Sequence, residues 1–545
     1  MKFKLLLSLC VAGASLSATA QGYKDGIEYY KADQFDNAKE LLLRNIDDAE
    51  TDKAISFYYL GCIAMKEGNI EEATKYFNDG IAANPEYAYN YVGLGAINLK
   101  NNDVKAAEKN FKQAEKLTKK DASIQIVIAR AYYDADPVAF AKEIAKRVDK
   151  ARRTNMEEAD IYMFEGDMAA DMKDWGSAAG KYEMATSFET NATEGYVKGA
   201  NMYFQINPAY SIELLKKLLE LNPTSALGQR ELANKYYDNN KFKEAVVEYE
   251  KYVQNPNHFK QDEDRFAFLL FYSGDYKKGY EFATALLQEN SENFTARRFQ
   301  FMNAAQLHEL KDQLIPMADA LIAAHSETNK FAPIDYSLIS EEYKTAGRID
   351  DAINVLNEAI AIIPQEINFH KQLSMVYLEK GDWTNVVESF RNYIEKKQEP
   401  TPTDVVQYAR FCYYGAINHK TTNPEKSNEL FAEATRIATE FCQKYPASHI
   451  GYKLIGDIKV QQADAADTSM INSVALDDYL KAIQVLEENN AVTKNIKDAQ
   501  ALYSYIGNYY LLEVKDVENA KEFYYKMLNL DPENTALREY IESLK

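Results

Sequence analysis

Apolar residues recur along this chain at the three- and four-residue spacing of amphipathic helices, and no run shows the alternation typical of a strand. The pattern is clearest in segments 54–87 and 88–121, which match each other at an interval of 34 residues. The matched positions are Phe57, Leu60, Gly61, Ala73 and Phe77, followed by Tyr91, Leu94, Gly95, Ala107 and Phe111. We therefore predict an all-α chain built from repeated helix–turn–helix units.

Small and turn-forming residues predict how each unit is assembled. Gly61 and Gly95 should let the first helix of a unit lie close to the second, where a larger side chain would clash. The turn within a unit is expected at Glu67-Gly68-Asn69, Asn101-Asn102-Asp103, Asp238-Asn239-Asn240, Ser273-Gly274-Asp275 and Lys380-Gly381-Asp382. Prolines that stop the second helix follow at Pro85, Pro223, Pro364 and Pro532.

The repeat resembles the tetratricopeptide repeat (TPR) family. In that pattern the first helix carries an aromatic residue, Leu-Gly and Tyr, and the second carries Ala, an aromatic residue, another Ala and then Pro. Segment 54–87 departs from it at two sites, with Ala64 in place of Tyr and Gly80 in place of the second Ala. The pattern continues in segments 192–225, 226–259, 333–366, 367–400 and 503–532. The resemblance implies an α–α superhelical solenoid of TPR-like repeats.

The register slips at several places, which suggests a division of the chain. Gly166 is a few residues out of step, Pro316 interrupts an otherwise helical stretch, and Lys396–Asp404 reads as a turn or linker. We predict an N-terminal solenoid over 21–325 and a C-terminal solenoid over 326–545, with a joint at Ala324–Pro333. Residues 401–499 should form longer hairpins with a connection at Ala463–Ser473, and Thr535–Lys545 a capping helix.

Residues 1–20 have the features of a secretory signal peptide. Lys2 and Lys4 precede an apolar stretch from Leu5 to Ala14, and Ala18-Thr19-Ala20 is a small-x-small cleavage site. Lipid attachment at Cys10 is the weaker alternative, because Leu7 occupies a position where such signals need Gly or Ala. We expect an exported protein, most plausibly periplasmic, with association at the outer membrane or full secretion left open.

The net charge narrows the range of partners. It is −20 for the whole chain and becomes −22 without residues 1–20, which hold two lysines and no acid. This acidity argues against nucleic acid and against anionic lipid surfaces, and no segment is long and apolar enough to insert into a membrane. It favours solubility and, if anything, basic partners.

The cysteines, the histidines and the known catalytic motifs give no indication of a disulfide framework, a metal site or an active site. Cys62, Cys412 and Cys442 are too few for a disulfide framework, although a bridge between Cys412 and Cys442 stays open. The six histidines are scattered singly, and no P-loop, dinucleotide fingerprint, nucleophile elbow or zinc spacing is present. We therefore expect neither an enzyme nor a bound cofactor or metal.

In TPR proteins, positions 2, 5, 9, 12 and 13 of each repeat line a concave groove, and the resemblance carries this assignment onto three segments. These groove positions are Ile55, Tyr58, Cys62, Met65 and Lys66; Thr193, Tyr196, Ala200, Tyr203 and Phe204; and Leu227, Arg230, Asn234, Tyr237 and Asp238. From them we select as candidate partner-binding residues Tyr58, Met65, Tyr196, Tyr203, Phe204, Arg230, Asn234 and Tyr237. Aromatic anchors of this kind could grip a peptide, while packing between repeats is the alternative for any one tyrosine.

Arg230 and Asn234 stand where some TPR proteins hold a terminal carboxylate. The following repeat offers Gln261, Asp264 and Phe268 in place of further basic residues, so a carboxylate clamp is the weaker interpretation. We expect a non-enzymatic scaffold or adaptor that docks peptides or helices of partner proteins, and membership of an envelope complex stays open. The alternative is a nutrient or glycan capture accessory at the outer membrane, which the scarcity of tryptophan, only Trp175 and Trp383, disfavours.

Overall fold

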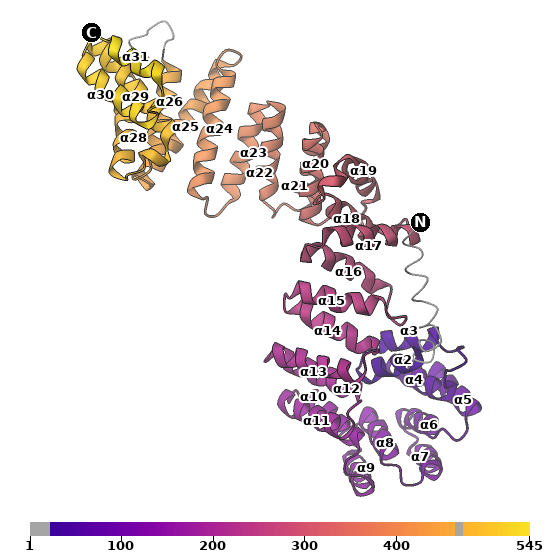
Figure 1. Ribbon diagram of the computed structural model, residues 1–545. Helices are drawn as coiled ribbons and strands as arrows, with labels where there is room; N and C mark the ends of the chain where they lie inside the picture. Colours follow the sequence, from indigo (N-terminus) through magenta and orange to yellow (C-terminus); the bar gives the residue numbers. More distant parts are fainter. Residues whose placement is uncertain (1–21, 464–471) are drawn as a thin grey trace. The chain divides into compact units, whose positions relative to one another are not determined.

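The computed structural model describes residues 22–463 and 472–545, in which every regular element is a helix (Figure 1). The predicted signal peptide and most of the predicted connection at Ala463–Ser473 lie outside the described residues. Contacts divide the chain into two compact units, Met1–Asn303 and Ala304–Lys545. The joint predicted at Ala324–Pro333 therefore falls inside the second unit.

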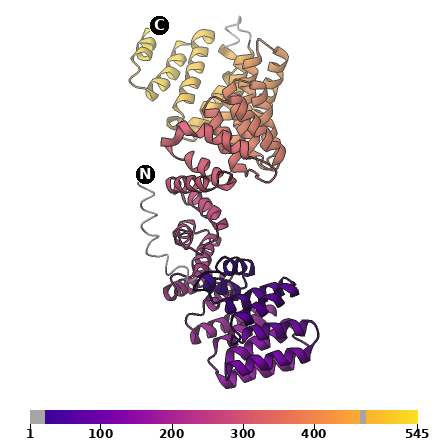
Figure 2. The same cartoon turned by 90° about the vertical axis from the view of Figure 1, so that its right-hand side faces the viewer.

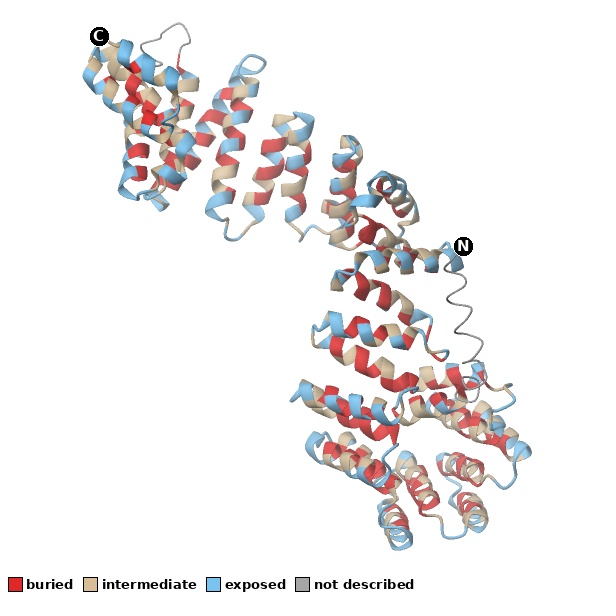
Figure 3. Cartoon of the chain, in the orientation of Figure 1, coloured by how far each residue is buried: buried red, intermediate tan, exposed pale blue. Residues whose placement is uncertain are grey.

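The first unit is a series of antiparallel helix pairs, each packed against the next. Its helices are α2 (Gly22–Lys31), α3 (Phe35–Arg44), α4 (Lys53–Lys66), α5 (Ile70–Ala83), α6 (Tyr89–Lys100), α7 (Val104–Thr118), α8 (Ala122–Ala135), α9 (Ala141–Thr154), α10 (Ala159–Asp171), α11 (Trp175–Phe188), α12 (Thr193–Phe204), α13 (Pro208–Leu221), α14 (Ala226–Asp238), α15 (Phe242–Val253), α16 (Gln261–Ser273), α17 (Tyr276–Glu289) and α18 (Phe294–Ala304). Buried residues are concentrated on the parts of the helices that meet neighbouring helices (Figure 3).

The tight turns between paired helices form as the sequence predicts. Gly68, Asn102, Asn240, Gly274 and Gly381 all adopt left-handed backbone angles, with φ between 55° and 85°. Glycine and asparagine tolerate this conformation better than other residues, which explains their recurrence at these turns. Aspartate or asparagine then caps the next helix at several of the turns, as where the Asn69 side chain accepts a hydrogen bond from the Glu72 backbone N–H.

The glycine that recurs in the first helix of a pair is required for close packing. A Cβ added at Gly61 would lie 2.5 Å from the Phe77 ring, and one at Gly95 would lie 2.3 Å from the Phe111 ring. Gly166 has the same relation to Tyr182 at 2.5 Å, although the sequence pattern placed it out of step. These distances confirm the predicted role of the small position.

The first unit closes on itself, because its first helix packs against helices that come much later in the chain. Helix α2 contacts α12 and α14, and the three lie side by side in Figure 1 and Figure 2. Glu28 accepts hydrogen bonds from Thr193 Oγ1 (3.0 Å), Asn222 Nδ2 (3.1 Å) and Ser225 Oγ (2.7 Å). The helices α4, α6, α8 and α10 complete the ring between α2 and α12.

The second unit continues with paired helices. Its elements are η1 (His308–Gln313), α19 (Leu314–Ala324), α20 (Pro333–Thr345), α21 (Ile349–Ile362), α22 (Asn368–Lys380), α23 (Trp383–Lys396), α24 (Pro402–His419), α25 (Pro424–Lys444), α26 (His449–Gln462), α28 (Leu476–Glu488), η2 (Val492–Lys494), α29 (Ile496–Tyr509), η3 (Tyr510–Val514), α30 (Val517–Leu530) and α31 (Thr535–Ser543).

Three predictions for the second unit can be compared with these elements. The turn predicted at Lys396–Asp404 joins α23 to α24. The α24–α25 hairpin is longer than the others, as expected, whereas α26 and α28 have 14 and 13 residues and are of ordinary length. Helix α31 caps the last pair by burying Ile541 against Ala520, Tyr524 and Leu528. Pro316 does not break a helix, since it lies in the first turn of α19, where a missing N–H costs little.

Candidate functional site

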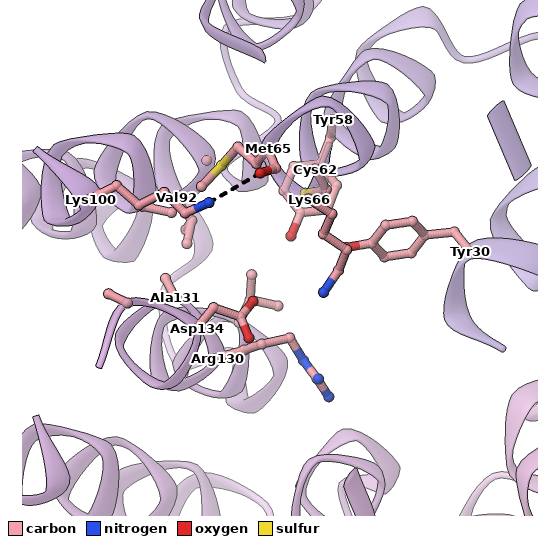
Figure 4. A pocket seen from close by; sticks show the side chains of 14 residues that line it. Tyr30, Tyr58, Cys62, Met65, Lys66, Val92, Lys100, Arg130, Ala131 and Asp134 are labelled. Atoms are coloured by element: carbon pink, nitrogen blue, oxygen red, sulfur yellow. Dashed lines mark hydrogen bonds between the residues drawn. The ribbon is translucent and has the colours of Figure 1, made fainter. Parts of the chain in front are cut away.

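The ring of the first unit encloses a central cavity of about 570 Å³, lined by the inner helices α2, α4, α6, α8, α10 and α12. A second hollow of about 220 Å³ adjoins it, between α2, α4, α6 and α8 (Figure 4). The two share Tyr30, Tyr58, Lys66, Val127 and Arg130 as lining residues. Both lie within the first unit and are preformed by its closure.

All five groove positions predicted for segment 54–87 line this space. Ile55 faces the larger cavity, Cys62 and Met65 face the smaller one, and Tyr58 and Lys66 face both. Figure 4 shows Tyr58, Cys62, Met65 and Lys66 together on α4, opposite Arg130 and Asp134 of α8. The candidate residues Tyr58 and Met65 are therefore brought together at the cavity.

An aromatic wall runs along one side of the cavity. The Tyr87 and Tyr89 rings stack with centroids 5.2 Å apart, and Tyr58 meets Tyr89 edge-on at 5.5 Å. Tyr30 and Tyr59 form a further edge-on pair at 4.9 Å. Burial raises the pKa of Tyr59 to about 12, so its hydroxyl stays protonated and able to donate a hydrogen bond at neutral pH.

The Cys62 thiol is shielded by this wall. Burial raises its pKa to about 12, although hydrogen bonds from the Tyr58 and Tyr30 hydroxyls act in the opposite direction. A protonated thiol is a poor nucleophile and a poor metal ligand, so Cys62 has a packing role. Cys412 and Cys442 are free and buried, so the bridge between them that the sequence left open does not form in this structure. Burial raises the pKa of Cys442 to about 11.

A charged network crosses the floor of the cavity around Asp167. This carboxylate accepts from Arg130 (2.6 Å), Lys198 Nζ (2.8 Å) and the Tyr182 hydroxyl (3.0 Å). Burial by itself would raise the pKa of Asp167, but the charges of Arg130 and Lys198 outweigh it and lower the pKa. Lys198 also pairs with Asp33 at 2.8 Å, which links α12 to the end of α2.

Carboxylates gather at another part of the cavity wall, which we call the acidic end: Glu158, Asp160, Glu189 and Glu194. Ser123 Oγ donates to Glu158 at 3.1 Å and also to Asp160. Lys31 Nζ pairs with Glu194 at 2.9 Å, and this neighbouring charge raises the pKa of Lys31 well above its usual value. The acidic end lies beside the aromatic wall, because Ser123, Tyr87 and Tyr89 line the same cavity.

The candidate residues of segment 192–225 lie elsewhere. Tyr196 is only 1% exposed, packs in the core and donates its hydroxyl to the Thr190 carbonyl at 3.1 Å. Tyr203 packs edge-on against Tyr210 at 4.8 Å, and Phe204 lies under Lys235 Nζ at 4.7 Å. Tyr196, Tyr203 and Phe204 therefore do not line the cavity, although Glu194 and Lys198 of the same helix do.

The candidate residues of segment 226–259 are engaged in contacts between repeats. Arg230 donates to both carboxylate oxygens of Asp262 (2.7 and 3.2 Å) and to Gln34 (3.1 Å). Asn234 Oδ1 accepts from the Tyr249 hydroxyl (2.8 Å) and from Arg265 (3.0 Å). Tyr237 packs edge-on against Phe268 at 5.9 Å. The Arg230 guanidinium is therefore already paired with the Asp262 carboxylate of the same chain.

Several cavity residues were missed from the sequence. Arg130 and Asp167 each follow the small residue of their repeat, Ala129 and Gly166, just as Cys62 follows Gly61. The repeat register could therefore have indicated both residues if the three-residue slip at Gly166 had been followed. Lys31, Glu194 and Lys198 reach the cavity through ring closure, for which the repeat pattern holds no signal.

Comparisons with known proteins support the repeat assignment. Residues 58–123 match the tetratricopeptide repeat family. This segment contains most of α4, all of α5, α6 and α7, and the start of α8, and so covers part of the cavity wall. Together with the helix pairs of both units, the match supports the predicted all-α solenoid of TPR-like repeats. A search of curated proteins finds no match.

Solved structures with similar folds include several TPR-type proteins. The C-terminal part of a TPR repeat-containing protein from Cytophaga hutchinsonii is 17% identical, with 51% of this chain and 98% of that chain covered and a TM-score of 0.41. Human IFIT1, solved as a dimer with PPP-AAAA, is 15% identical, with coverages of 83% and 94% and a TM-score of 0.31. Yeast Tom70 is similar over 97% of this chain and 100% of its own, at a TM-score of 0.29. All three TM-scores lie below 0.5, so these likenesses carry no functional argument.

Residues 22–463 and 472–545 contain no group of three His, Cys, Asp or Glu side chains placed to hold a metal ion. Over the same residues, no helix combines the length and apolar character needed to cross a bilayer.

Proposed function

We propose that the chain is a non-enzymatic scaffold or adaptor of the cell envelope that docks a segment of a partner protein in the central cavity of its first unit. The observation that carries this proposal is the cavity of about 570 Å³, onto which the inner helices of successive TPR-like repeats converge. Ligand sites in proteins are concave, largely preformed and of this size. The signal-peptide pattern of residues 1–20 supports the envelope location.

The cavity volume bears on the form of the docked segment. An α-helix with its side chains is about 10–12 Å across, so this space holds about one helical turn. An extended peptide, or the end of a helix, fits it better than a long helix does. The aromatic wall would supply rigid contact area, and the protonated hydroxyls would supply hydrogen-bond donors.

The proposal is tested by crosslinking in intact cells followed by purification of the full chain. A defined partner protein should co-purify, and the variant Val127→Trp should lose it, because Val127 lines both hollows and the larger ring would fill them. Val247→Trp is the matched control, since Val247 is exposed on the outer helix α15. The absence of any specific partner, or equal recovery with both variants, would contradict the proposal.

Glycan or nutrient capture at the outer membrane is the second candidate. The stacked Tyr87–Tyr89 pair beside carboxylates is the observation that favours it, because sugars stack on aromatic rings and hydrogen-bond to carboxylates. A sugar ligand would raise the midpoint of thermal unfolding at saturating concentration. An oligosaccharide panel that leaves this midpoint unchanged would count against capture while leaving the scaffold proposal intact.

A further inference from the structure

We propose that the acidic end of the cavity recognises a cationic group on the docked segment, namely a lysine or arginine side chain or a free amino terminus. This inference rests on the proposed function and gives the docked peptide its chemistry. It combines three observations: a cavity of sufficient size, an excess of carboxylates at one part of its wall, and aromatic rings next to them.

The charges at the acidic end are not balanced by the protein. Glu194 pairs with Lys31 at 2.9 Å, whereas Glu158, Asp160 and Glu189 form no ion pair with any lysine, arginine or histidine of the described chain. Four carboxylates therefore share one cation. Within a concave wall, such an excess focuses negative potential into the cavity and attracts positively charged ligands.

The carboxylates of the acidic end are also partly or largely buried, which strengthens the electrostatic repulsion between them. Glu194 is 7% exposed, and Glu158 and Asp160 are half-buried. Glu189 is more exposed and lies at the rim; partial burial, and then the charges of Glu194 and Asp160, still raise its pKa despite the opposing charge of Lys31. A cation arriving from a ligand would relieve this repulsion, which is the physical basis of the selectivity.

The aromatic wall completes a site for a cation. Tyr59 and Tyr89 lie close enough to Asp160 for its charge to add to the effect of burial in raising the pKa of each hydroxyl. A cation placed against Asp160 would therefore also approach the faces or hydroxyls of these rings. Lysine and arginine side chains bind favourably over tyrosine rings.

An anionic ligand is disfavoured by the same contacts. Arg130 and Lys198, which line the cavity floor, already hold Asp167 at 2.6 and 2.8 Å. Lys66 lies over the Phe35 ring at 5.0 Å and is exposed. The cavity thus offers an acidic ligand few cations, and those it has are mostly engaged.

Peptide titration of the full chain by calorimetry tests the inference, with trilysine and triglutamate as probes. Trilysine should bind and triglutamate should not. The double variant Asp160→Asn with Glu189→Gln should weaken trilysine binding at least tenfold. The control double variant Glu71→Gln with Glu281→Gln removes the same charge from exposed positions of the outer helices α5 and α17, and it should change the affinity less than twofold.

Equal weakening by both double variants would mean that trilysine senses only the net charge and would overturn the inference. Spermidine serves as a free polyamine, and tighter binding of spermidine than of trilysine would overturn the assignment to a peptide. Thermal unfolding of each variant establishes that the first unit remains folded.

The same double variants distinguish failure of this inference from failure of the proposed function. If the wild-type chain captures a partner in cells and the Asp160→Asn, Glu189→Gln variant captures as much, only the cationic specificity is wrong. If the wild-type chain captures no specific partner, the scaffold function itself is wrong.

Discussion

Segments 54–87 and 192–225 share one repeat register but present their groove positions to different surroundings. Tyr58 and Tyr196 both stand at position 5 of their repeats. Both rings pack among buried apolar residues, but Tyr58 is 9% exposed and lines both hollows, whereas Tyr196 is 1% exposed and lines neither. Helix α2 contacts both α4 and α12, so it does not account for the difference. The Tyr196 ring instead lies under Lys217 Nζ of α13 at 5.7 Å, and its hydroxyl donates to the Thr190 carbonyl.

This comparison shows what a repeat register determines. The register gives the direction in which a side chain points from its helix, since equivalent positions lie on equivalent faces. Whether that face is open depends on which other helix packs against it. A third position-5 residue, Arg230, illustrates the point, because it points inward but meets Asp262 and Gln34.

The largest expected loss of stability follows substitution of Arg230. This substitution tests whether position 5 of segment 226–259 stabilises the fold or is available to a partner. Arg230→Ala would leave Asp262, only 4% exposed, as an unpaired buried charge. We expect it to lower the free energy of unfolding by about 3–5 kcal/mol in urea titration. Lys243→Ala, at an exposed position of α15, is the control and should have little effect. A loss below about 1 kcal/mol for Arg230→Ala would return this residue to the list of binding candidates.

Glycine substitutions should sharpen the comparison next. Gly61→Leu should lower the free energy of unfolding by about 1–3 kcal/mol, because even a Cβ there would lie 2.5 Å from the Phe77 ring. At Gly199, the equivalent position of segment 192–225, a Cβ would find its nearest neighbour at 3.7 Å. Gly199→Ala should therefore be neutral or stabilising by up to about 1 kcal/mol. Similar losses for both variants would contradict the packing account.

The contributions of Asp167 and Glu28 to the free energy of unfolding should change with pH in opposite directions. The lowered pKa of Asp167 gives stability that is present above its unfolded value of about 4 and is lost as the pH falls. Burial raises the pKa of Glu28, despite hydrogen bonds from Ser225 and Thr193 that lower it. Its contribution is therefore greatest at low pH and is lost as the pH rises through the raised value.

Unfolding measured from about pH 3 to about pH 7 checks this contrast. The stability difference between wild type and Asp167→Asn should increase with pH, and that between wild type and Glu28→Gln should decrease, by about 1.4 kcal/mol for each unit of pKa shift. If both stability differences changed with pH in the same direction, the opposite pKa shifts assigned to Glu28 and Asp167 would be wrong.

The smallest expected effects concern the two tyrosine hydroxyls. Tyr196→Phe removes a hydrogen bond to the Thr190 carbonyl and should cost about 1 kcal/mol. Tyr58→Phe should change the free energy of unfolding by less than about 0.5 kcal/mol, because its hydroxyl bonds to the Cys62 thiol, which is a weak hydrogen-bond acceptor. It should instead reduce recovery of the crosslinked partner. The reverse ranking in thermal or urea unfolding would contradict the assignment of core and cavity.

Local features of the fold could be predicted from the sequence because they depend on residues close in the chain. The turns at Gly68 and Asn102, the small position at Gly61 and the capping helix from Thr535 all follow from side-chain size and backbone freedom. Gly456 against Tyr479 repeats the Gly61–Phe77 packing, but a longer connection between the two helices hid it.

Ring closure could not be predicted in this way. The bonds that make it join residues 163 to 232 positions apart, from Lys31–Glu194 to Asp25–Asn257. Each of these bonds joins polar residues of a kind that is also common on exposed helix faces, so the sequence does not mark them. The acidic end could not be predicted for the same reason, because Glu158 and Glu189 lie at the ends of different helices and only the folded ring places them on one cavity wall.

The most direct test of the account places a photoreactive amino acid at Met65 or at Tyr203, which occupy position 12 of segments 54–87 and 192–225. Both side chains are half-buried, but only Met65 lines the cavity. Irradiation of cells carrying the full chain should link a partner protein to position 65 and not to position 203. A partner linked at 203 and absent at 65 would contradict the claim that the closed ring of the first unit is the docking site.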